Sequence, residues 1–100
     1  EKFGVRAPMV GHMGDGNFHV ILPFDPKNKE SYKKIRSFND TLIKKSLELN
    51  GTITGEHGVG LHKKEYLLEQ HPDNIPVMKS IKRTLDPNNI MNPGKIFDLN

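Results

Sequence analysis

Four ionisable residues stand in two short, glycine-containing segments, and their types could support metal or acid–base chemistry. His12 and His19 bracket the first segment, while Glu56 and His57 are neighbours in the second. Two imidazoles and one carboxylate suit a divalent ion that keeps open coordination positions, which is typical of a catalytic site rather than a structural one. Two other interpretations are open: partly exposed histidines on a sheet surface, and a Glu56 that caps the backbone of a helix entry.

The first two histidines belong to a β-hairpin predicted over residues 5–24. Asp15-Gly16 is the favoured centre of a two-residue type I′ turn, in which both residues need a positive φ. This turn would place His12 directly opposite His19, with Cβ atoms about 4.5–5.5 Å apart on one face of the sheet. Alternation of side chains gives the opposite face an apolar character, and we expect it to pack on helices; its members are Met9, Gly11, Met13, Phe18, Val20 and Leu22.

The remaining chain is predicted to be mostly helical, which makes the fold class α+β. Apolar residues at three- and four-residue spacing predict a long helix over 28–49; they are Tyr32, Ile35, Phe38, Leu42 and Leu49. The glycine-rich segment 51–60 allows close backbone approach to a ligand. Helices are expected over 61–70 and 74–85, the second capped by Asp73, and the tail should be largely irregular.

The composition is that of a soluble chain without cysteine. Its 100 residues fit one domain or part of one, and the lack of an initiator Met favours a cut domain. Absence of cysteine excludes disulfides and thiolate zinc sites. The net charge of +3 could indicate nucleic-acid binding. However, that would need exposed aromatic residues among the lysines, and the lysines concentrate on the long helix as a solvated face.

Three segments resemble the signatures of one enzyme family. Gly11–His19 is similar to GHxGDGNxH, Gly51–Gly60 resembles the second family motif, and Leu85–Lys95 resembles LDPxxIxNPGK. These motifs are typical of FAD-linked oxidoreductases of the vanillyl-alcohol oxidase type. The subgroup includes D-lactate dehydrogenase, glycolate oxidase and D-2-hydroxyglutarate dehydrogenase.

The resemblance implies a role for each motif residue. His12, His19 and Glu56 would bind a divalent metal such as Zn, Mn or Fe. His57 would lie near the substrate hydroxyl and take its proton, since imidazole titrates near neutrality, and Asn92 would lie near the flavin. The activity implied is oxidation of a D-2-hydroxy acid to the 2-oxo acid, with hydride transfer to FAD.

The resemblance also implies that this chain is one part of a larger enzyme. Residues 1–100 would form the C-terminal half of a ferredoxin-like substrate (cap) domain, with a tail, 86–100, returning to the FAD domain. FAD would be bound mainly by that N-terminal domain, and the chain alone should be inactive. Its partners would be a small 2-hydroxy acid, the FAD domain and an unidentified electron acceptor, without nucleic acid. The expected location is the cytoplasm, or a peripheral position at the membrane.

Separation from the rest of the enzyme should leave much apolar surface exposed, and the chain could then form a homodimer.

Ile21 shares the predicted face of His19 and is the expected substrate-binding residue beside His57. An apolar side chain there offers no hydrogen bond to a second carboxylate, which favours D-lactate or a similar short acid over a dicarboxylate. A metal-dependent hydrolase using His12, His19 and Glu56 is an alternative, but it gives the Leu85–Lys95 segment no role.

Overall fold

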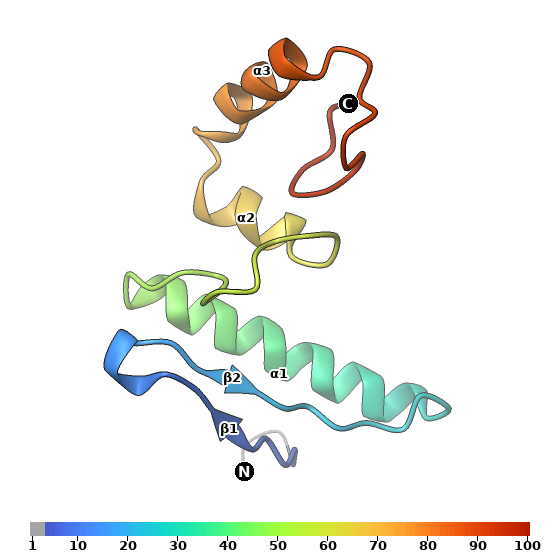
Figure 1. The fold of residues 1–100 in the computed structure, drawn as a ribbon. Coiled ribbons are helices and arrows are strands. Elements are labelled where there is room, and N and C mark those ends of the chain that lie inside the picture. The colour runs from blue at the N-terminus through green and yellow to red at the C-terminus, as the bar shows by residue number, and fades with distance from the viewer. Residues whose placement is uncertain (1–3) are drawn as a thin grey trace. The chain divides into compact units, whose positions relative to one another are not determined.

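The computed structural model describes residues 4–100, which divide into two compact units, Glu1–Glu56 and His57–Asn100. The first three residues of the predicted domain 1–100 lie outside the described part. A two-stranded antiparallel sheet and three α-helices make up the regular structure of the described residues (Figure 1). The α+β class is therefore confirmed.

The first unit begins with a short hairpin whose register differs from the predicted one. Strands β1 (Met9–Val10) and β2 (His19–Val20) pair antiparallel, and Val10 faces His19. The prediction that His12 faces His19 is wrong. Its cause lies in the turn: Met13–Asp15 forms a short 3₁₀ turn, η1, and only Gly16 in it has a positive φ, of 75°. A type I′ turn needs a positive φ at Asp15 as well.

Helix α1 (Lys29–Glu48) follows the hairpin and confirms the long helix predicted over 28–49. Asn28 caps it, because its Oδ1 accepts from the backbone N–H groups of Glu30 and Ser31. At the other end Asn50 has a left-handed φ of 62°, and the N–H of Gly51 donates to the Ser46 carbonyl at 2.7 Å. In Figure 1, α1 runs back along the second arm of the hairpin and ends near the level of its turn.

Only part of the predicted apolar pattern of this unit is buried. Ile43 and Ile53 form its small core. Tyr32 and Leu49, predicted on the buried stripe of the helix, are 48% and 71% exposed, and the ring of Tyr32 instead contacts Phe24. The hairpin face predicted to pack on helices is largely uncovered within this unit, since its members Met9, Met13 and Phe18 are exposed.

The second unit contains α2 (Lys64–Gln70), α3 (Ile75–Leu85) and a tail without helix or strand. Both helices were predicted, but α2 starts after a turn over 61–63 rather than at Leu61. Asp73 does not cap α3 as predicted; the residue before the helix is Asn74, whose side chain makes no capping hydrogen bond. Leu67 and Ile75 are buried here.

The carboxylate of Asp86, 6% exposed, joins α3 to the tail of the second unit. It accepts from the Lys82 ammonium and from the backbone N–H groups of Ile90 and Met91. These donors lower its pKa: the hydrogen bond from Lys82 acts most strongly, then that from Met91, against the opposing effect of desolvation.

Exposed apolar surface is extensive in both units, as predicted for a part of a larger protein. Within residues 4–100, sixteen large apolar residues are exposed, among them Met13, Leu85 and Ile90 at more than 75% each.

Candidate metal centre

The hairpin turn holds the backbone of His12 through several hydrogen bonds. The His12 carbonyl accepts from the N–H groups of Asp15, at 2.9 Å, and Asn17, at 3.3 Å. In return, the His12 N–H donates to Asn17 Oδ1 at 3.1 Å. His12 and Asn17 thus bond to each other in both directions, which fixes the backbone that carries the first imidazole.

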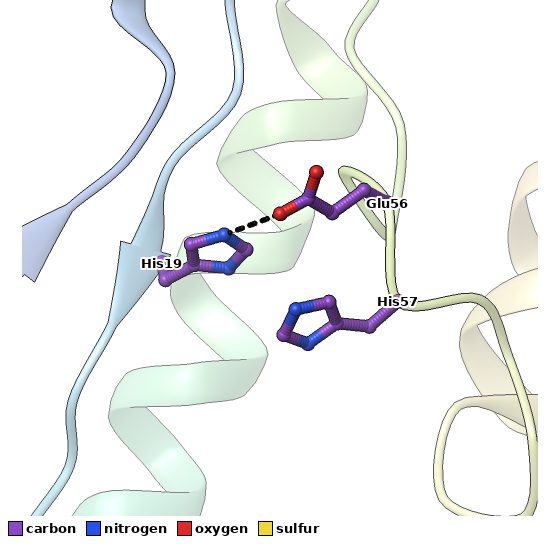
Figure 2. Close-up of side chains that lie close together, drawn as sticks. All are labelled: His19, Glu56 and His57. Carbon is purple, nitrogen blue, oxygen red and sulfur yellow. Dashed lines mark hydrogen bonds and ion pairs between the residues drawn. The ribbon is translucent and has the colours of Figure 1, made fainter.

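Glu56 reaches both predicted histidine ligands with the same carboxylate oxygen. Its Oε1 lies 2.9 Å from His19 Nε2, as Figure 2 shows, and 3.9 Å from His12 Nε2. The side chain of His19 is 30% exposed, that of Glu56 42% and that of His12 64%. Glu56 is therefore hydrogen-bonded to His19, whereas His12 lies beyond hydrogen-bonding distance of the same oxygen.

The wrong register does not separate these residues, because the observed pairing is shifted from the predicted one by an even number of positions. His19 pairs with Val10 instead of His12, a shift of two positions. Side chains alternate between the faces of a strand with a period of two, so a shift of two preserves the face of every residue. A shift by one would have reversed the faces.

The segment that carries Glu56 is anchored to the end of α1. Ile53 is buried, and Ser46 Oγ donates to the Thr52 carbonyl at 3.0 Å. Thr52 Oγ1 donates to the Thr54 carbonyl at 2.7 Å, which tightens the turn before Gly55. The carboxylate therefore extends from a supported backbone rather than from a free loop.

His57 is joined to Glu56 by one peptide bond. Ligating atoms of His19, Glu56 and His57 all lie within 4.8 Å of one another (Figure 2). His12, the other predicted histidine ligand, is not part of this group and lies farther from Glu56 than His19 does.

The donor set of the first unit fits a divalent ion. Imidazole nitrogen with one carboxylate oxygen suits Zn, Mn or Fe(II), and two histidines with one carboxylate leave coordination positions open. The exposure of His12 and Glu56 gives an ion and a small ligand access to these donors.

Two further predicted site residues have different settings. Ile21 is 52% exposed, and its N–H donates to the Pro8 carbonyl at 2.9 Å. This bond continues the hairpin pairing beyond β2, so Ile21 lies two positions from His19 on the same strand arm. Asn92 lies in the tail of the second unit, with a left-handed φ of 49°.

Sequence reasoning missed the contact between Asn17 and Gly55. A Cβ at Gly55 would lie 3.0 Å from Asn17 Cβ, so the two segments touch next to the site. Asn17 occurs in a turn, where asparagine is common for local reasons, and no spacing signal links it to a residue 38 positions further on.

Among residues 4–100, no helix is both long enough and apolar enough to cross a membrane.

A hairpin, a long returning helix and a glycine-rich segment that gather two histidines and a glutamate define a candidate divalent-metal site in an α+β domain. Residues 1–96 match the family model described as FAD linked oxidases, C-terminal domain, and the chain belongs to this family. The resemblance identified from the three motifs is thereby confirmed.

The chain is similar to curated oxidoreductases of several 2-hydroxy acids. It is 45% identical over 96 residues to a probable mitochondrial D-lactate dehydrogenase of Danio rerio, covering 95% of this chain and 19% of the relative. It is 41% identical to glycolate oxidase subunit GlcD of Bacillus subtilis, covering 96% and 21%. It is 46% identical to D-2-hydroxyglutarate dehydrogenase of Stutzerimonas stutzeri, covering 87% and 19%. The chain thus spans about a fifth of the length of these relatives.

Proposed function

We propose that this chain supplies the metal- and substrate-binding part of an FAD-dependent dehydrogenase that oxidises a D-2-hydroxy acid of the D-lactate or glycolate type. The observation that carries the proposal is the 2.9 Å contact between His19 and one oxygen of Glu56, with His12 3.9 Å from the same oxygen, in a chain that matches the family model. The names of the relatives support the substrate class.

His12, His19 and Glu56 are the proposed ligands of a divalent ion such as Zn, Mn or Fe. When bound, such an ion acts as a Lewis acid that orients the substrate and favours the alkoxide form of its hydroxyl. The three side chains come from the hairpin and from the segment after α1.

His57 is the proposed proton acceptor for the substrate hydroxyl. A ring nitrogen of His57 would take this proton while the Cα hydride leaves for FAD, the cofactor that supplies the redox chemistry. The products are the 2-oxo acid and reduced flavin.

The rest of the enzyme is proposed to complete the site. Residues 1–100 would be the C-terminal half of a ferredoxin-like cap domain, and the tail 86–100, with Asn92, would return to an FAD-binding domain. The exposed apolar residues of this chain support such a covering domain in the same protein.

The experiment uses the full-length protein, with flavin bleaching followed anaerobically after mixing with D-lactate, glycolate or D-2-hydroxyglutarate. We expect bleaching by a D-2-hydroxy acid, its loss after chelator treatment and its recovery with added Mn²⁺ or Zn²⁺. His19→Ala should abolish the recovery, whereas His71→Ala, a histidine outside the site, should not. Bleaching that is unaffected by chelator and by His19→Ala would refute the metal role.

A further inference from the structure

Asn17 occupies a position between the two segments that carry the candidate ligands. Its Oδ1 accepts from the His12 N–H at 3.1 Å, and its own N–H donates to the His12 carbonyl at 3.3 Å. The same side chain faces Gly55, the residue before Glu56. One asparagine therefore touches the backbone of one ligand and the immediate neighbour of another.

The contact with Gly55 would be crowded by a side chain unless Asn17 shifted. A Cβ on Gly55 would lie 3.0 Å from Asn17 Cβ, 3.7 Å from its Cγ and 3.9 Å from its Nδ2. The closest of these atoms is the root of the Asn17 side chain, which cannot rotate away. The φ of Gly55 is not in the left-handed region, so glycine is needed here for space and not for backbone conformation.

The backbone of Asn17 also lies close to the opposite arm of the hairpin. A Cβ on Gly11 would lie only 2.5 Å from the Asn17 carbonyl oxygen and from Phe18 Cα. The two arms of the hairpin therefore approach each other closely at Gly11, so Asn17 lies between close neighbours on its backbone and on its side chain.

We propose that Asn17 is a positioning residue, which acts with Gly55 to hold the carboxylate of Glu56 at bonding distance from His19 and within reach of His12. This inference deepens the proposed function and rests on it where it concerns a metal. The contact between Glu56 and His19, however, can be tested without a metal ion.

The first test is a Co²⁺ titration of the metal-free full-length protein, followed by visible absorption, which reports both affinity and coordination geometry. Asn17→Ala should weaken Co²⁺ binding about 10–100-fold, the usual cost of losing a group that orients metal ligands. Asn17→Asp keeps the acceptor oxygen and should restore at least about tenfold of this loss. An unchanged thermal midpoint would separate positioning from general unfolding.

Glycine substitutions provide a matched pair. Gly55→Ala should weaken Co²⁺ binding like Asn17→Ala, whereas Gly14→Ala should not, because a Cβ on Gly14 meets nothing within 4 Å. Asn17→Gly removes the side-chain atoms that a Cβ on Gly55 would meet. Gly55→Ala should therefore cause no further loss of Co²⁺ affinity in this background. A double-mutant cycle detects this coupling.

The second test needs no metal. Diethyl pyrocarbonate modifies free imidazole nitrogen, and the Glu56 contact shields His19 Nε2. The rate of His19 modification, mapped by mass spectrometry, should rise several-fold in Asn17→Ala and Gly55→Ala and stay unchanged in Gly14→Ala.

The two measurements separate the two proposals. If the parent protein binds Co²⁺ through His19 while Asn17→Ala binds it equally well, the positioning role is overturned and the proposed function stands. If the parent protein binds no metal, the proposed metal role fails, and the modification rates decide the role of Asn17. Equal rates in the parent, Asn17→Ala and Gly55→Ala proteins would overturn it.

Discussion

His19 Nε2 and Glu56 Oε1 lie 2.9 Å apart although the two residues are 37 positions apart in sequence. Their side chains are 30% and 42% exposed, and solvent-exposed ion pairs contribute little to stability, about 0–1 kcal/mol. The fold therefore gains little from this contact. The proposed metal role would account for its placement, because ligand binding benefits from groups that are accessible and already close together.

Replacement of Glu56 should distinguish a role in ligand binding from a role in stability. Glu56→Gln keeps the size of the side chain but removes the anionic oxygen, so we expect at least about a 100-fold loss of divalent-metal affinity. Unfolding free energy should change by no more than about 1 kcal/mol. Metal titration and thermal unfolding measure the two effects, with Glu69→Gln on exposed α2 as the control. A large stability loss with unchanged metal affinity would contradict this.

Asn28 should stabilise the start of α1. Asn28→Ala removes the acceptor of two backbone N–H groups, those of Glu30 and Ser31, and should cost about 1 kcal/mol of helix stability. Asn28→Asp retains an acceptor and should cost little. Amide hydrogen exchange of the first turns of α1 in the full-length protein measures the difference; equal protection in both variants would exclude a capping role.

Asp86 should make the second unit less stable in acid. Its pKa is lowered below the ordinary 3.8, mainly by Lys82, so the unfolded chain takes up the proton at a higher pH than the folded one. The stabilisation is therefore fully present above about pH 3.8 and is lost as the pH falls through the folded pKa. Asp86→Asn should be less stable than the parent at neutral pH, and this difference should shrink in acid.

Amide exchange of residues 86–91, corrected for the intrinsic rate at each pH, measures this dependence. Asp98→Asn is a suitable control, because Asp98 is exposed and pairs with Lys64 at the surface. A difference between Asp86→Asn and the parent that does not change with pH would show that the charge of Asp86 is not involved.

Ile21 should disfavour substrates with a second carboxylate. It lies two positions from His19 on the same strand arm and offers no hydrogen-bonding group, and burying an unpaired carboxylate costs several kcal/mol. We expect the full-length enzyme to have a higher kcat/KM for D-lactate than for D-2-hydroxyglutarate. Ile21→Arg should reduce this preference, whereas Met9→Arg, on the other arm and next to Val10 in the strand, should affect both substrates alike, because neighbouring residues of a strand point to opposite faces. A parent enzyme that prefers the dicarboxylate would refute the inference.

Local sequence signals predicted the helices well and the hairpin register poorly. The spacing of apolar residues located α1, because this signal acts within a few residues. The turn of the hairpin depended on one φ angle at Asp15. Hydrogen bonds from Asp15 and Asn17 to the same His12 carbonyl favour the 3₁₀ turn over type I′, and such a competition cannot be read from residue types.

The candidate site was predicted as a set of residues but not as a geometry. Motif resemblance named His12, His19 and Glu56, and the even register shift kept both histidines on one face. No sequence signal indicated that both histidines approach the same oxygen of Glu56, or that Asn17 contacts Gly55. Both features depend on where the chain returns after α1.

The length of α1 determines how far the chain returns toward the candidate site. Its 20 residues rise about 30 Å, which returns the chain along the second arm of the hairpin (Figure 1). The segment after the helix then carries Glu56 to within 2.9 Å of His19. Deleting one helical turn would pull the carboxylate back by about 5.4 Å, so any shortening of α1 must be matched by a shorter arm before it.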